Sequence, residues 1–232
     1  MLSNSVSIPY KNIPGFSPTT VHGHAGTLVA GQLDDQNILI MNGRFHAYEG
    51  HSMKQLGFPI QVMNRLGVNK LIITSASGGV NENYRPGDII VIKDHLNLVR
   101  NHPIIGFENK DPHRCFDIYS SKLIDWVLSL GKELNIPLQS GIYTYMSGPQ
   151  FETPAEVRMI RLLGGDLAGM STVPEALIAA HLGIDIIGLS YVANLGAGMM
   201  DTTSLSHSEV LETMAKIQPM VLRLVKTILQ NW

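Results

Sequence analysis

Short apolar runs separated by glycine- and proline-containing turns dominate the chain. The runs at 70–74 and 88–93 are continuously apolar, which is typical of strands covered on both faces. Further strands are expected at 27–30, 37–41, 142–146, 166–170 and 185–191. Because these runs alternate with helical patterns, they predict an α/β fold with a largely parallel or mixed central β-sheet flanked by helices. Neither a linker nor a repeat interrupts the pattern, so one domain over residues 1–232 is expected.

Capping motifs indicate where helices begin. In three places a Ser or Thr is followed three residues later by Glu, the pattern of a capping box. The boxes are Thr153–Glu156, Thr172–Glu175 and Ser206–Glu209. An earlier helical stretch carries apolar residues at 56, 60 and 63 and ends before Gly67. The last helix has an apolar stripe over 210–228, and Pro219 within it should cause a kink.

The charge balance excludes several classes of protein. Lys and Arg total 17 against 19 Asp and Glu, so the formal charge is −2 and no nucleic-acid partner is expected. No apolar run reaches the length of about eighteen residues that a membrane span needs, so no membrane partner is expected. The single Cys, Cys115, excludes an internal disulfide. The N-terminus lacks the pattern of a secretory signal, so a cytoplasmic location is expected.

Candidate chemistry lies in the loops that follow the strands, because ligands of α/β sheets bind beyond the carboxyl ends of strands. Arg44 and His46 are two residues apart and point the same way, which suits an anion such as phosphate. Ser171 lies just before a helix, whose N-terminal N–H groups favour an anion. The small residues at 74–79 form an expected loop whose N–H groups could also reach phosphate. A surface Arg, a helix cap and an ordinary turn are the alternatives.

A second group of loop residues suits a flat heterocycle. Phe151 lies beside Glu152, which combines stacking with a carboxylate that accepts from ring N–H groups. Asn194 can donate and accept at once, as a ring carbonyl next to a ring nitrogen requires. A solvated loop Glu and a turn Asn are the alternatives. His22 and His24 form an H-x-H without a third ligand at suitable spacing, so no metal site is expected.

These loops resemble the trimeric, low-molecular-mass purine nucleoside phosphorylases. The matching segments occur in family order and cover nearly the whole chain. They are IPYKNIPGFSPTTVHGHAG, NGRFHAYEGHSM, TSASGGVN, SGPQFETPAEVRMI, GMSTVPEALIAAHLGI, ANLGAGM and LSHSEV. It implies phosphorolysis: inorganic phosphate attacks C1′ of a purine nucleoside and releases the base and the pentose 1-phosphate. No cofactor would be needed, since phosphate is a co-substrate. The implied partners are the purine nucleoside, phosphate and two further copies in a homotrimer.

The resemblance also implies a role for each matching residue. Phosphate would be held by Arg44, His46, the Ala76 N–H, Ser171 and His24. Ribose would contact Tyr48, Met170 and His207, although first-turn solvation is the ordinary role for a His such as His207. The purine would contact Phe151, Glu152 and Asn194. The expected catalytic residues are Asn194, Glu152 and His46.

Two departures from the family keep alternatives open. Relatives usually begin with a further helix, a strand and a G-S-G phosphate loop, which this chain does not show. Three alternatives are therefore considered: a longer natural chain, a short active form and a non-catalytic nucleoside-binding paralogue. The stretch 101–121 does not align cleanly, and Phe107 and Phe116 are candidates to close a neighbouring site. Glu152 with Asn194 matches the 6-oxopurine pattern of inosine and guanosine, whereas a methylthioadenosine phosphorylase carries an acid at the Asn position.

Overall fold

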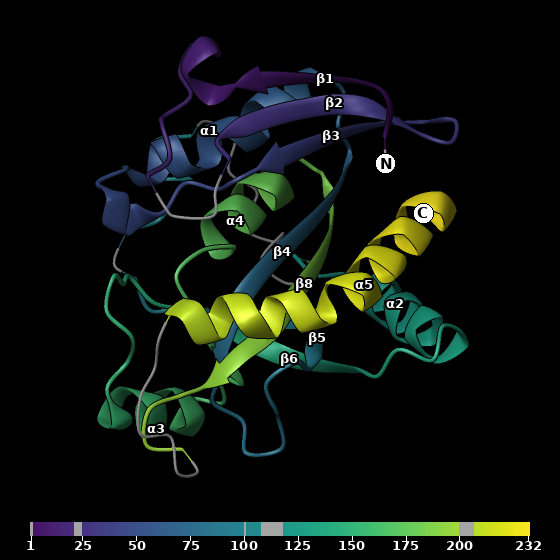
Figure 1. Cartoon of the computed structure of the whole chain (residues 1–232). Helices are drawn as coiled ribbons and strands as arrows, with labels where there is room; N and C mark the ends of the chain where they lie inside the picture. Colours follow the sequence, from purple (N-terminus) through teal and green to yellow (C-terminus); the bar gives the residue numbers. More distant parts are fainter. Residues whose placement is uncertain (1, 21–24, 100, 108–117, 200–206) are drawn as a thin grey trace.

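Two β-sheets and five α-helices make up the part of the chain that the computed structural model describes, which is residues 2–20, 25–99, 101–107, 118–199 and 207–232 (Figure 1). The larger sheet is a closed barrel in the order β4-β7-β6-β5-β8. Its strands are β4 (Lys70–Gly79), β5 (Ile89–Asn97), β6 (Leu138–Tyr145), β7 (Leu167–Gly169) and β8 (Asp185–Leu195). β4 runs parallel to β8, and β6 runs parallel to both β5 and β7. The other two pairings are antiparallel.

A three-stranded antiparallel sheet lies beside the barrel. It is formed by β1 (Ser3–Pro9), β2 (Thr27–Leu33) and β3 (Gln36–Asn42), with β2 in the middle. A tight turn joins β2 to β3, and Asp34 in that turn has a left-handed φ of 52°, which a short polar side chain tolerates. The end of β3 delivers the chain toward the barrel, at the start of the loop that carries Arg44.

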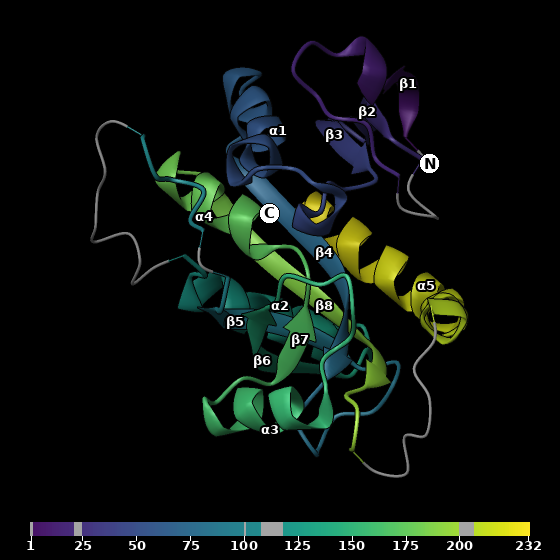
Figure 2. The same cartoon turned by 90° about the vertical axis from the view of Figure 1, so that its left-hand side faces the viewer.

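The helices cover the barrel in separate groups (Figure 2). They are α1 (Met53–Arg65), α2 (Ser121–Glu133), α3 (Pro154–Leu162), α4 (Val173–His181) and α5 (His207–Asn231). α1 and α4 share one apolar core with β4 and β6, and α2 and α5 share another with β5 and β8. The predicted stripe of α5 is part of this second core through Ile217, Leu224 and Ile228. Figure 1 shows α5 bending near its middle, where Pro219 lies.

The α/β class with a mixed sheet is confirmed, but several expected boundaries are wrong. Residues 74–79, expected as a loop, continue β4, because Thr74 to Gly79 pair with β8. Their small residues signal a turn by composition, and ladder pairing overrides that signal. The strands expected at 27–30 and 37–41 do form, as longer strands of a separate antiparallel sheet. β1 and α2 were not predicted; β1 has a mostly exposed, polar sequence.

Two of the three predicted capping boxes form. The Thr153 N–H donates to Glu156 Oε2 at 2.7 Å, and the Thr172 N–H donates to Glu175 Oε2 at 2.9 Å. The third box includes Ser206, which lies outside the described residues. The helix that it would begin starts at His207.

Close contact between α1 and α4 depends on Gly57. A Cβ atom at Gly57 would lie 2.5 Å from Cγ1 of Ile178, which is fully buried in α4. We expect Gly57→Ala to lower the free energy of unfolding by about 1–3 kcal/mol despite the better helix propensity of Ala, because the core would be overpacked. Urea denaturation measures the change. Lys54→Ala, at an exposed position of the same helix, should stay within about 0.5 kcal/mol of the wild type; equal stability of both variants would contradict this packing.

Candidate active site

One cavity of about 1850 Å³ lies where β3 and the barrel strands end, and it continues as a groove between β3, β4 and α5. Strand ends from both sheets and the N-terminal end of α4 border it. Nine of the site residues predicted from the sequence line this cavity: Arg44, His46, Tyr48, Ala76, Phe151, Glu152, Met170, Ser171 and Asn194. The structure therefore brings together residues that are up to 150 positions apart in the chain.

Alternation after β3 aims Arg44 and His46 at the cavity and Phe45 away from it. Phe45 is buried, and its ring centroid lies 5.3 Å from that of Tyr10 and 6.0 Å from that of Phe16. The Tyr10 hydroxyl donates to the Gly43 carbonyl at 2.8 Å. Aromatic packing of this kind fixes the loop, so Arg44 and His46 on either side of Phe45 are held in place by the core.

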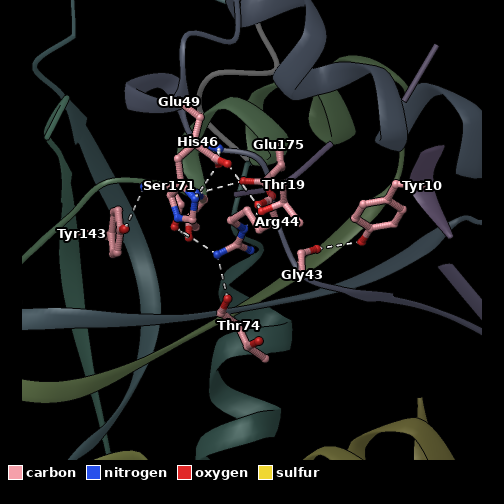
Figure 3. A network of polar contacts seen from close by, with 11 residues as sticks. Tyr10, Thr19, Gly43, Arg44, His46, Glu49, Thr74, Tyr143, Ser171 and Glu175 are labelled. Atoms are coloured by element: carbon pink, nitrogen blue, oxygen red, sulfur yellow. Dashed lines mark hydrogen bonds and ion pairs between the residues drawn. The ribbon is translucent and has the colours of Figure 1, made fainter. Parts of the chain in front are cut away.

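Arg44 makes three bonds to the barrel side of the cavity (Figure 3). Its Nε donates to Glu175 Oε1 at 2.7 Å. Its Nη1 donates to the Thr74 carbonyl at 2.9 Å and to Ser171 Oγ at 3.0 Å. The guanidinium is therefore placed beside Ser171, as anion binding by both groups requires.

Glu49 holds His46. One carboxylate oxygen accepts from the His46 N–H at 2.8 Å and lies 3.4 Å from Nδ1 of the same residue. The other accepts from the Thr20 N–H at 2.7 Å. Burial raises the pKa of the Glu49 carboxyl, but hydrogen bonds from Thr20 and His46 outweigh it and hold the pKa below its usual value. An ionised Glu49 orients the imidazole, whose ring also stacks on Tyr48 at a centroid distance of 4.8 Å.

The opposite end of the cavity is suited to a flat ring. Phe151 and Glu152 lie between β6 and α3, and Asn194 lies near the end of β8, where its Nδ2 donates to the Leu195 carbonyl at 3.0 Å. Burial raises the pKa of the Glu152 carboxyl, and the charge of Glu156 adds to the increase. A half-exposed aromatic, a carboxylate and a carboxamide therefore face one space.

Tyr48 and Met170 meet at Gly148 between these two ends. Gly148 has φ +61°, and an added Cβ would lie 3.0 Å from Tyr48 Cδ1 and closer still to Met170 Sδ. Glycine is required here because both neighbours approach its backbone. This places the two expected ribose contacts next to each other.

The remaining predicted site residues are not described in detail. His24 lies outside the described residues, and His207 is the first residue of α5, with no description of its side chain. Phe107 packs edge-on against His181 of its own chain, at a centroid distance of 5.3 Å. Phe116 lies outside the described residues. Within the described part of the chain, no group of three His, Cys, Asp or Glu could hold a metal ion, and no helix is long and apolar enough to cross a membrane.

Three supporting residues escaped the sequence analysis: Glu49, Tyr143 and, apart from its cap, Glu175. The buried Tyr143 hydroxyl accepts from the Ser171 N–H at 3.4 Å. Nothing in the local sequence of a strand tyrosine indicates such a partner. Glu49, by contrast, lies three residues after His46 in the position of a capping-box Glu, and that spacing could have identified it.

Comparison with known proteins gives matches over nearly the whole chain. The family model described as the phosphorylase superfamily matches residues 1–230. The chain is 44% identical to purine nucleoside phosphorylase 1 of Bacillus subtilis, covering all of this chain and 86% of that one. It is 43% identical to the protein of that name in Geobacillus stearothermophilus, covering 99% of this chain and 85% of that one. A crystal structure of a Schistosoma purine nucleoside phosphorylase with hypoxanthine superposes with a TM-score of 0.91 at 33% identity, covering 99% of this chain and 85% of the other.

Proposed function

This chain belongs to the purine nucleoside phosphorylases of the phosphorylase superfamily, which are pentosyltransferases, and we propose that it cleaves 6-oxopurine nucleosides in the cavity described above. Inosine, guanosine and their deoxy forms are the proposed substrates. The observation that carries this proposal is the polarity of the cavity. Arg44 and the Ser171 hydroxyl lie together near Thr74 of β4, whereas Asn194 lies at Gly78, farther along the same strand, and Phe151 and Glu152 line the same cavity.

Phosphate is proposed to bind at the end formed by Arg44, His46 and Ser171, with the Ala76 backbone N–H beside them. The Arg44 guanidinium and the Ser171 hydroxyl are already 3.0 Å apart, so one phosphate can contact both. Placing the nucleophile this way replaces a bimolecular encounter by an oriented one. Its negative charge would also stabilise the positive charge that develops on the sugar as the glycosidic bond breaks.

The purine is proposed to bind against Phe151, with Glu152 accepting from its N1–H. Asn194 would bond the O6/N7 edge. Negative charge moves onto the base as it leaves, and the Asn194 carboxamide can donate one hydrogen to Leu195 and offer the other to that edge. Tyr48, Met170 and His207 are the proposed ribose contacts. The reaction as proposed consumes phosphate and uses no cofactor.

A homotrimer is part of the proposal. On α3 and at its C-terminal end, Met159, Leu162 and Leu163 are 41, 88 and 53% exposed. Large exposed apolar groups that lie together are typical of subunit contacts. A cytoplasmic location also stays a prediction, based on the single Cys.

The first experiment measures hypoxanthine release from inosine with and without inorganic phosphate. We expect release that depends on phosphate and yields ribose 1-phosphate in equal amount. Release without phosphate would indicate hydrolysis, and binding of hypoxanthine without any release would favour the non-catalytic alternative.

Arg44→Met is the paired variant; it should raise the KM for phosphate by about tenfold or more, because a charge-assisted contact to the anion is lost.

Asn194 should determine the preference for the 6-oxo edge. In Asn194→Asp we expect kcat/KM for inosine to fall by about tenfold or more, because the donor to the purine is lost. The ratio of adenosine to inosine turnover should rise, since a carboxylate accepts from a 6-amino group. Asn194→Ala is the control, which should lower both activities without changing their ratio in this direction. An unchanged ratio in Asn194→Asp would exclude this role and reopen the methylthioadenosine-type alternative.

Glu152 should give the reaction an acid limb. Its carboxylate must be ionised to accept from the purine N1–H, and burial raises its pKa. As the pH falls through this raised pKa, the accepting form is lost, so kcat/KM for inosine should decline at a higher pH than the ordinary Glu pKa of about 4.3 would give. In Glu152→Gln this limb should disappear. Circular dichroism at each pH separates it from unfolding, and an identical acid limb in both chains would refute the assignment.

A further inference from the structure

Glu175 contacts two separate parts of the phosphate end through its two carboxylate oxygens (Figure 3). Oε1 accepts from Arg44 Nε at 2.7 Å, across 131 residues of sequence. Oε2 accepts from the Thr172 N–H at 2.9 Å. The Arg44 and Glu175 side chains are only 18 and 13% exposed, so this ion pair is shielded from most of the solvent. Such pairs are strong when both members are also hydrogen-bonded.

Thr172 is held in a strained turn. Its φ of 72° and ψ of −54° are those of a γ-turn with positive φ, and the Val173 N–H donates to the Ser171 carbonyl at 2.8 Å. This conformation is rare and unfavourable for a β-branched residue. It persists only where neighbouring contacts hold it, and the bond to Glu175 is one of them. This turn also fixes the direction of the Ser171 side chain.

Arg44 and the Ser171–Thr172 turn are therefore joined twice. Arg44 Nη1 donates to Ser171 Oγ at 3.0 Å, and Glu175 connects the guanidinium to the Thr172 backbone. Nε of Arg44 donates to Glu175, so the carboxylate sets the plane of the guanidinium while Nη1 donates to Ser171 Oγ. The planar fork of Arg makes this orientation specific.

We propose that Glu175 is a positioning residue for phosphate: it fixes the Arg44 guanidinium and the Ser171 turn in one geometry, so that both contact the same anion. This inference rests on the proposed function. Glu175 acts through Arg44 and Thr172. A carboxylate in direct contact with phosphate would repel it, and engagement of both oxygens with protein donors prevents such a contact.

The chain contains a matched control for this role. Glu156 occupies the same position in the other T-x-x-E box, and its Oε2 accepts from the Thr153 N–H at 2.7 Å and from the Thr153 hydroxyl at 2.9 Å. It lies at the start of a helix of the same length, nine residues. Glu156 therefore has the capping role without the bond to Arg44, and a comparison of the two Glu→Gln variants isolates the positioning role.

The test measures steady-state kinetics with inosine and inorganic phosphate, and phosphate binding by calorimetry, for Glu175→Gln, Glu156→Gln and the wild type. In Glu175→Gln we expect the KM and the Kd for phosphate to rise by about tenfold or more. The KM for inosine should be unchanged, and kcat should be largely kept at saturating phosphate. Glu156→Gln should lose less thermal stability than Glu175→Gln, because no ion pair is broken, and should keep the phosphate KM of the wild type. A phosphate KM in Glu175→Gln that is equal to or lower than that of the wild type overturns the proposal.

A double-mutant cycle shows whether Glu175 acts through Arg44. Adding Glu175→Gln to Arg44→Met should raise the phosphate KM little beyond the single Arg44 variant, and fully multiplied effects would overturn the positioning role. If the wild type neither turns over inosine nor binds phosphate, both the proposed function and this inference fail. If Arg44→Met weakens phosphate binding and Glu175→Gln does not, only this inference fails.

Discussion

The Arg44–Glu175 ion pair connects the three-stranded sheet, through α4, to the barrel at the cavity, and the geometry of the candidate site depends on it. Arg44 follows the last strand of the three-stranded sheet, and Glu175 lies in the first turn of α4, which packs on the barrel. The loop that carries Arg44 is separately anchored by Phe45 in an aromatic cluster. Packing of Phe45 in the core thus fixes the backbone next to Arg44, and the bond to Glu175 fixes the position of the Arg44 guanidinium.

Local sequence patterns predicted the features that depend on residues close together in the chain. The box at Thr172–Glu175 formed as expected, and the alternation of residues 44–46 correctly placed Arg44 and His46 on the cavity. The second role of Glu175 was not predictable, because its partner lies 131 residues away. Composition failed at 74–79 for the same reason: pairing with β8, a distant segment, turns a glycine- and serine-containing stretch into strand.

A second constraint on the site is the close approach of side chains to the backbone, which glycine allows at two positions. Gly148 allows Tyr48 and Met170 to meet over its backbone. Gly169 lies against the Tyr143 ring, so that a Cβ there would collide with the hydroxyl that accepts from Ser171. Side chains at either position would displace the groups that line the cavity. Local sequence shows a glycine at both places but not which side chain approaches it.

The charged residues that line the cavity make geometry, more than net charge, the expected determinant of the proposed anion binding. Among the described lining residues, Arg44 and Lys70 are the Lys and Arg side chains. Lys70 donates to the Trp232 carbonyl at 2.8 Å, at the start of β4, six residues before Ala76. Glu175 balances the charge of Arg44, so a phosphate bound there as proposed would meet oriented donors rather than an unpaired cation. Preorganised donors keep their strength in a partly buried site and are screened less by salt than an exposed cationic patch.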